Sequence, residues 1–465
     1  MTKNRPVAYP YIPNSAPRTK KEMLRELGVS DIDLLFSAIP PELRLNRPLN
    51  LPDPLLSEFA LRKHVNKILG KNTSADEHIS FLGSGCYQHY VPAVCDEVNQ
   101  RNEFLTAYSG KAYEDHGRWQ ALFEYASMMG ELLNMDVVNL PTYDGHQAAA
   151  TAMRMALNIT GRKEILINKA IHPDKLSKIL DYNSHICKFK FIDFDSRTGE
   201  IDLSQLEQAI SVDIAAIYFD NPNFFGVIET NGKKISDLAH QHGVLTIVGA
   251  DPISLGILKP PADYGADITC GDIQSLGMHM QFGGGQAGYV ATRDEVKFVM
   301  EYPNRIVGIV PTKVAGEYGF GEVAFERTSF MVREKAREWV GTMANLWAIT
   351  AGVYLALMGP QGMVEVGEAI RMRVEYAMET LSNIPGVQIQ FPNSAHFREF
   401  VVDFSHSKKS VAEINRALLQ RGIFGGYDLS GRLPAFKNHA IYCVTEIHTK
   451  EDIDTLAQNL TEVLA

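Results

Sequence analysis

Asp251 is the residue with the most specific chemical implication, because it directly follows the apolar run 244–250. Short apolar runs of this kind predict buried strands of a parallel sheet. A carboxylate at the end of such a strand suits the partner of the protonated pyridine nitrogen of pyridoxal phosphate. Aspartates are common at strand ends, so a structural role also fits. Asp251 is therefore a candidate residue for a cofactor pocket, and it needs support from a second residue.

The second residue would be a lysine whose amine holds that cofactor covalently, and the chain lacks it. The lysine is expected at the end of the next predicted strand, where residues 271–277 read Gly-Asp-Ile-Gln-Ser-Leu-Gly. Gln274 and Ser275 stand at the expected position, whereas Lys259 comes too early and Lys297 too late. Without an amine no Schiff base forms on this chain. The pattern predicts the scaffold of a pyridoxal enzyme without its nucleophile.

Other cofactors and metals have little support in the sequence. Residues 83–88 and 283–288 are rich in glycine, but neither segment has the strand, GxGxxG and helix context of a dinucleotide site. The chain has no Walker A or HExxH sequence, and its 14 histidines are dispersed. We therefore expect no nucleotide site and no metal site.

Composition and charge narrow the partners and the compartment. The 465 residues carry a formal net charge of −10 without a basic tract, which argues against nucleic acids and anionic membranes as partners. The longest apolar stretch, 346–358, is shorter than the ~20 residues that span a bilayer. Five scattered cysteines without CxxC spacing indicate neither a disulfide framework nor a zinc site. We expect a cytoplasmic protein.

The elements that must position these residues form three predicted parts. Residues 1–75 form an arm of short helices around a proline-rich run, with too little core to stand alone, so it should cover another domain or a partner chain. Residues 76–325 alternate apolar strands with helices, which predicts a large α/β domain with a doubly wound, mostly parallel sheet. Residues 326–465 read as connecting helices, 333–358 and 362–381, and a small C-terminal α+β domain.

A resemblance to a known family rests on short segments spread in order over nearly the whole chain. They are residues 23–30, 39–52, 81–94, 103–108, 143–145, 251–256, 271–277, 282–285, 333–336 and 359–362. Together they resemble subunit 1, the alpha subunit, of the two-chain P-protein, glycine dehydrogenase (decarboxylating), of the glycine cleavage system.

The resemblance implies a fold-type-I pyridoxal-enzyme architecture and a partner. In this family the beta-type subunit carries the lysine and binds pyridoxal phosphate, whereas the alpha-type subunit has Gln-Ser at that position, as at Gln274 and Ser275. The implied reaction decarboxylates glycine and passes its aminomethyl group to the lipoyl arm of the H-protein. By analogy the assembly is a heterotetramer, and the alpha chain completes the active site of the beta chain.

The chain departs from the family pattern in stretches that resemble those facing substrate and cofactor. The departures lie in 108–117, in 143–148 and in 337–342. The candidate residues of the interface or substrate wall are Tyr108, Lys111, His116, Asp144, His146 and Asn221.

Three interpretations stay open. The chain is a glycine-cleaving subunit that has diverged, a paralogue with its own beta-like partner that acts on another small amino acid or acceptor, or a non-catalytic structural or regulatory subunit. His172, in an Ile-His-Pro-Asp segment that matches the family, is either a site residue or a helix cap. His172, Asp251, Gln274 and Ser275 would form a relic of the cofactor pocket.

Overall fold

The structure is a computed structural model that describes residues 12, 15–47, 49–104, 112–323, 327–329, 334, 336, 338, 340 and 343–465. The side chains of residues 112–117 are not among those described. The chain divides into two compact units, Met1–Asn72 and Thr73–Ala465. The predicted boundaries at 75 and 325 stay predictions.

The first unit consists of short helices, as the sequence predicts. Helix α1 (Pro17–Glu26) starts with a proline at its first position, which suits a helix start because no hydrogen bond is lost there. Helix α2 (Glu58–Leu69) is capped by the Ser57 hydroxyl, which accepts the N–H of Ala60. Neither helix has a buried residue. This unit therefore has no helix-packed core of its own.

The second unit is built on a seven-stranded sheet with the strand order β2-β8-β7-β6-β5-β3-β4. Strand β8 runs antiparallel to both of its neighbours, and the remaining strand pairs are parallel. This confirms the predicted mostly parallel sheet. Its strands are β2 (Val137–Val138), β3 (Glu164–Asn168), β4 (Lys188–Ile192), β5 (Ile214–Asn221), β6 (Leu245–Ala250), β7 (Ile268–Asp272) and β8 (Gly288–Thr292).

Helices cover both faces of this sheet because alternate side chains of its strands point to opposite faces. In β3, Ile165 and Ile167 pack in a core with residues of α5 and α6, whereas Leu166 packs with residues of α7 and α8. The helices are α5 (Gly145–Thr160), α6 (Pro173–Asn183), α7 (Leu203–Ala209) and α8 (Gly232–Gln241). Because helices cover both faces, the central strands β5 and β6 read as almost continuous apolar runs, whereas the edge strand β4 alternates lysine and phenylalanine.

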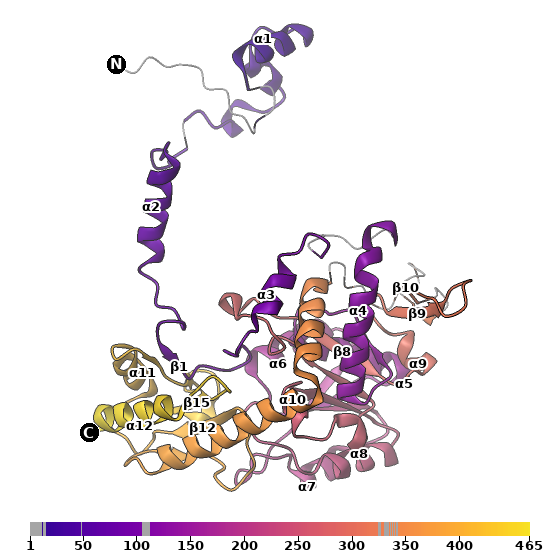
Figure 1. The fold of residues 1–465 in the computed structure, drawn as a ribbon, viewed down its shortest axis with the longest axis vertical. Helices are drawn as coiled ribbons and strands as arrows, with labels where there is room; N and C mark the ends of the chain where they lie inside the picture. The colour runs from indigo at the N-terminus through magenta and orange to yellow at the C-terminus, as the bar shows by residue number, and fades with distance from the viewer. Residues whose placement is uncertain are drawn as a thin grey trace. The chain divides into compact units, whose positions relative to one another are not determined.

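Helix α10 (Asn345–Ser382) leads from the large sheet to a smaller one (Figure 1). The sequence predicts two helices here, and α10 indeed consists of two helical stretches that meet at a kink at Gly359, where a φ of 58° and the following Pro360 break the regular geometry. The predicted start at Arg333 is wrong, since the helix begins at Asn345. The sequence between them has no proline to reveal this, and tertiary context sets the helix start.

The small sheet is antiparallel, with the strand order β11-β12-β15-β14, and helices α11 and α12 flank it in sequence. Its elements are β11 (Gln388–Ile389), β12 (Glu399–Asp403), α11 (Val411–Leu419), β14 (Tyr427–Asp428), β15 (His439–Cys443) and α12 (Lys450–Leu464). Strand β1 (Ile79–Ser80) pairs with β13 (Ile423–Phe424), so a segment from before the large sheet joins the C-terminal region. This pairing brings the Gly83–His89 segment close to the C-terminal strands.

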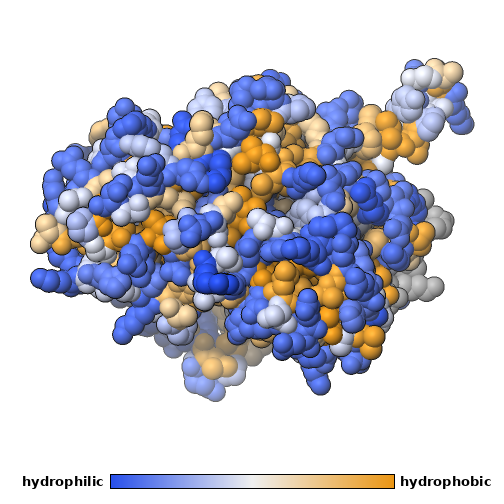
Figure 2. All heavy atoms as spheres, turned by 90° about the horizontal axis from the view of Figure 1, so that it is seen from below, coloured by the Kyte–Doolittle hydropathy of each residue, from blue (hydrophilic) through white to orange (hydrophobic). Residues whose placement is uncertain are grey.

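The remaining elements of the second unit are α3 (Ala93–Asn99), α4 (Ala112–Leu133), α9 (Val296–Val299), β9 (Val307–Pro311) and β10 (Tyr318–Glu322). Trp119 and Leu122 of α4 are buried and pack in the core that holds Ala348 of α10. The face shown in Figure 2 mixes hydrophilic residues with groups of hydrophobic ones. Among the described helices, none combines the length and apolar character needed to cross a membrane.

Candidate functional site

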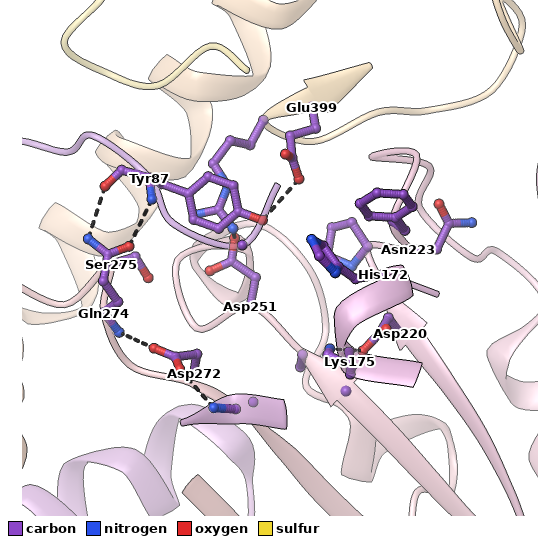
Figure 3. Close-up of a pocket in the computed structure, with 18 of the residues that line it drawn as sticks. Tyr87, His172, Lys175, Asp220, Asn223, Asp251, Asp272, Gln274, Ser275 and Glu399 are labelled. Carbon is purple, nitrogen blue, oxygen red and sulfur yellow. Dashed lines mark hydrogen bonds and ion pairs between the residues drawn. The ribbon is translucent and has the colours of Figure 1, made fainter. Parts of the chain in front are cut away.

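A pocket opens where the carboxyl ends of β5, β6 and β7 meet the start of β12 (Figure 3). Ligand sites of open α/β sheets lie at this edge, because the loops after parallel strands converge there. The cavity has a volume of about 120 Å³. It is lined by Gly85, Tyr87, Gly145, His146, His172, Lys175, Asp220, Pro222, Asn223, Phe224, Gly249, Ala250, Asp251, Gly271, Asp272, Gln274, Ser275, Gln286, Phe397, Arg398 and Glu399.

Five residues that the sequence singles out line this pocket together. They are His146, His172, Asp251, Gln274 and Ser275. They come from α5, from the start of α6 and from the segments that follow β6 and β7. The topology therefore gathers residues that are far apart in the chain.

The other predicted wall residues are placed differently. Asn221 is buried, and its side chain bonds to the Glu229 backbone and to the Tyr264 hydroxyl, so its neighbour Asn223 lines the pocket instead. Asp144 caps α5, because its carboxylate accepts the N–H of Gln147 at 2.7 Å. Tyr108 and Lys111 lie outside the described residues, as does the His116 side chain.

Asp251 is paired with a buried arginine. Its Oδ2 lies 2.6 Å from Arg398 Nη2, and the two side chains are 11% and 6% exposed. Arg398 Nη1 lies 3.0 Å from His89 Nε2, and the guanidinium carbon lies 3.4 Å from the centre of the Tyr87 ring. Burial alone would lower the pKa of Arg398, but Asp251 raises it above its ordinary value. The arginine is therefore charged.

The Asp251–Arg398 pair belongs to a longer series of polar side chains that are hydrogen-bonded to one another. His89 Nδ1 donates to Glu446 at 2.8 Å, and the Tyr90 N–H donates to the same carboxylate. Burial would raise the pKa of Glu446, yet its bonds to His89 and Tyr90 hold it at about 2. The contacts among Asp251, Arg398, His89 and Glu446 thus link the end of β6 to the C-terminal strands.

Gln274, which stands with Ser275 where the sequence predicts the lysine, has a side-chain amide that is hydrogen-bonded at both of its ends. Its Oε1 accepts the N–H of Tyr87 at 3.0 Å, and its Nε2 donates to the Tyr87 carbonyl and to the Met278 carbonyl. Gln274 is 2% exposed. It therefore fixes the Tyr87 segment against the loop after β7 and has no free group for chemistry.

His172 is both a helix cap and a pocket residue. Its Nδ1 accepts the N–H of Asp174 at 3.0 Å at the start of α6. Its Nε2 must then carry the proton that it donates toward Ser84, whose hydroxyl lies at 2.8 Å. Because the imidazole is a donor here, it does not act as a base for that hydroxyl. Burial and the neighbouring His146 and Lys175 lower the pKa of His172 to about 4.

Replacing His172 by asparagine should flatten the pH dependence of stability, because asparagine keeps the cap but has no ionisable ring. A histidine whose pKa falls from 6.5 to about 4 on folding takes up a proton more readily when unfolded, so it removes stability as the pH drops through that window. We expect the wild-type chain to lose about 2 to 3 kcal/mol more than the variant between pH 6.5 and 4. Urea unfolding at a series of pH values measures this, and parallel curves would contradict it.

Lys175 is the one lysine among the described residues that line the pocket, and it is not a free amine. Its Nζ lies 2.8 Å from Asp220 Oδ1, and the two side chains are 17% and 9% exposed. Burial would lower the pKa of Lys175, but Asp220 raises it, so the group stays an ammonium ion. Lys175 lies on α6, so a search of the sequence for polar residues at the ends of predicted strands does not identify it as a pocket residue.

Asp272, the last residue of β7, also lines the pocket. Its Oδ2 accepts the N–H of Gly145, the first residue of α5, at 2.8 Å, and its Oδ1 accepts the N–H of Gln274 at 2.8 Å. Burial raises the pKa of Asp272 to about 7, although these N–H groups oppose the rise. Like Asp251, it ends an apolar strand, and this shared signal could have identified it.

Glu399 faces the same pocket from the start of β12. Its Oε1 accepts the N–H of Ser84 at 2.6 Å, and its Oε2 accepts the Tyr87 hydroxyl proton at 3.0 Å. Burial raises the pKa of Glu399, opposed by Arg398. No sequence signal marks Glu399, Arg398 or Tyr87 as pocket residues. In the described part of the chain, no cluster of three or more His, Cys, Asp or Glu residues could hold a metal ion.

The sheet and the position of this pocket define the fold-type-I architecture of pyridoxal enzymes. Two solved structures share the fold at low sequence identity. The sphingosine-1-phosphate lyase of Burkholderia pseudomallei aligns with a TM-score of 0.64 and 15% identity, covering 91% of this chain and 94% of its own. A NifS-like protein aligns with a TM-score of 0.62 and 14% identity, covering 83% of this chain and 99% of its own.

Within this class, the chain belongs to the glycine cleavage system P-protein family, whose family model matches residues 10–460. It is 38% identical to the probable glycine dehydrogenase (decarboxylating) subunit 1 of Staphylothermus marinus, over 98% of both chains. The protein of the same description from Desulforamulus reducens is 38% identical over 97% of this chain and 99% of its own. A crystal structure of the glycine decarboxylase (P-protein) in inhibitor-bound form aligns with a TM-score of 0.84 and 33% identity, covering 98% and 100% of the two chains.

Proposed function

We propose that this chain is the lysine-lacking alpha-type subunit of a heteromeric glycine dehydrogenase (decarboxylating). The observation that carries the proposal is at Gln274 and Ser275, where the sequence predicts the Schiff-base lysine: no amine stands there, and the Gln274 amide makes three hydrogen bonds to backbone groups. Lys175, the lysine in the pocket, is committed to Asp220. Because the described residues of the pocket offer no available amine, a second chain would supply it.

In this proposal the partner is a lysine-bearing beta-type subunit that holds pyridoxal phosphate, and the two form a heterotetramer in the cytoplasm. The cofactor would serve as the electron sink for decarboxylation of glycine. The aminomethyl group would then pass to the lipoyl arm of the H-protein. Full-length similarity to relatives described as subunit 1 supports a second subunit.

The contribution of this chain would be to complete the wall of the partner's active site. Tyr108, Lys111, His116, Asp144, His146 and Asn221 remain the proposed wall residues. His146 has the strongest structural support, because it lines the pocket and its ring forms no hydrogen bond within the described residues. Burial and Lys175 lower the pKa of His146 to about 4, so it would face a ligand as a neutral imidazole. Asp144 and Asn221 have the weakest structural support, since both side chains are bonded elsewhere.

Assembly and cofactor content test this proposal. We expect the chain to co-purify with the beta-type subunit, to reach heterotetramer mass by light scattering and to contain one pyridoxal phosphate for each pair of chains. Changing the Schiff-base lysine of the partner to alanine should abolish covalent retention of the cofactor. Two cofactors for each pair would contradict the assignment of the cofactor to the partner.

Alanine substitutions distinguish a site role from a structural one. In the assembled complex, Tyr108→Ala, Lys111→Ala, His116→Ala and His146→Ala are compared with Lys297→Ala, whose side chain is 52% exposed and does not line the pocket. Reduced turnover with intact assembly supports a role in the site. Unchanged turnover in all four variants would contradict it and favour a non-catalytic subunit.

A further inference from the structure

The two places in the pocket that could bind the pyridine nitrogen and the phosphate of the cofactor are each already in contact with a side chain of this protein. An aspartate after β6 suits a protonated pyridine nitrogen, and the N-terminus of a helix suits a phosphate. Here Asp251 already has a cation, because Arg398 lies 2.6 Å away. The N-terminus of α5 already has a hydrogen-bond acceptor, because the Gly145 N–H donates to the Asp272 carboxyl group at 2.8 Å.

Arg398 is held in place at some conformational cost. Its φ of 61° lies in the left-handed region, which is unfavourable for a bulky side chain, and Ser84 at the same pocket has a φ of 63°. The guanidinium is flanked by Asp251, His89 and the Tyr87 ring. The Tyr87 ring covers the flat guanidinium, a cation–π stacking that helps to hold this buried cation in place.

Asp272 is also committed to its position. It is buried, and both of its carboxylate oxygens accept backbone N–H groups, one from Gly145 and one from Gln274. A methyl group added at Gly145 would lie 2.9 Å from Asp272 Cβ, so the helix and the carboxylate are closely fitted. A phosphate could reach this helix end only by displacing Asp272.

We propose that this chain carries built-in substitutes for the cofactor, with the Arg398 guanidinium in the place of the pyridinium and the Asp272 carboxyl group, as acceptor of the backbone N–H groups, in the place of the phosphate. The residues present therefore do not fit pyridoxal phosphate. Among the described residues that line it, the pocket has no free amine, and the Glu399 carboxyl group on its wall already accepts the Ser84 N–H and the Tyr87 hydroxyl. The substitutes keep the sheet and the C-terminal strands joined in a cofactor-free chain.

The consequence is testable with the full chain alone and does not depend on the proposed function. The probe is pyridoxamine 5′-phosphate, which has the same pyridine nitrogen and phosphate but no aldehyde that could react with surface lysines. Calorimetric titration should show no saturable binding to the wild-type chain at millimolar concentrations. Arg398→Met should bind at least about tenfold more tightly than wild type, and Arg398→Met with Asp272→Asn more tightly still.

The control is Arg398→Met combined with Asp251→Asn, which should return to wild-type behaviour because no carboxylate remains for the pyridinium. If Arg398→Met does not fold, Arg398→Gln takes its place, since an amide still donates toward Asp251. Micromolar binding by the wild-type chain would overturn the proposal. So would a folded variant, judged by circular dichroism, that lacks Arg398 and Asp272 and binds no better than wild type.

Discussion

Replacing Arg398 by methionine is expected to lower the free energy of unfolding by about 4 kcal/mol, because a buried charge loses its partner. Asp251 is 11% exposed and has Arg398 as its ion-pair partner. His89 would lose the donor on its Nε2, and Tyr87 the cation against its ring. Urea unfolding of the full chain, followed by circular dichroism, measures the loss.

Two controls show whether the loss of stability comes from the unpaired Asp251 charge or from removing an arginine in general. Adding Asp251→Asn to Arg398→Met should restore much of the stability, because the unpaired charge is gone. Arg197→Met removes an arginine that pairs with Asp195 at the surface, where its side chain is 85% exposed, and should have no measurable effect. If Arg398→Met were as stable as Arg197→Met, the buried pair would not be structurally important.

Replacing Gly226 by alanine should destabilise the chain by about 4 kcal/mol or more, because the new methyl group meets fixed backbone. Gly226 has a φ of 77°, and a Cβ there would lie 1.7 Å from the Glu399 carbonyl oxygen. The Phe397 N–H also donates to the Gly226 carbonyl at 2.9 Å. Making room would move the segment that carries Arg398 away from Asp251.

Gly161→Ala is the matched control for this substitution. Gly161 has a φ of 67°, but no atom lies within 4 Å of the added Cβ. It should therefore cost only the conformational penalty of a left-handed alanine, about 1 kcal/mol. Equal losses for the two variants in urea unfolding would show that backbone conformation, and not the contact with Glu399, governs position 226.

The sheet could be predicted from the sequence because its signals are local. The runs that form β5 and β6 are almost continuously apolar and buried, since helices cover both faces of the sheet there. The positions of Asp251 and of the lysine-free segment at Gln274 could be predicted for the same reason, because each comes at the end of a predicted strand. Asp272 shares this signal, although the sequence argument does not use it.

The rest of the pocket could not be predicted, because it depends on contacts between distant segments. Arg398 and Glu399 reach the pocket only when β12 is placed against the loop after β5, a contact made possible by Gly226. Tyr87 is held by the Gln274 side-chain amide, which bonds to both the N–H and the carbonyl of Tyr87. No pattern in the sequence predicts such a contact. The left-handed backbone of Arg398 also has no signature, since arginine does not favour it.

Exchange of labelled bicarbonate into the carboxyl group of glycine tests the central claim most directly. The chain is assembled with its beta-type partner and lipoylated H-protein, and each component is omitted in turn. We predict exchange with the full mixture, no exchange with this chain alone, and loss of exchange when the Schiff-base lysine of the partner is changed to alanine. A well-formed complex with bound pyridoxal phosphate that exchanges no label into glycine would contradict the claim. Exchange into another small amino acid would then identify a specialised paralogue.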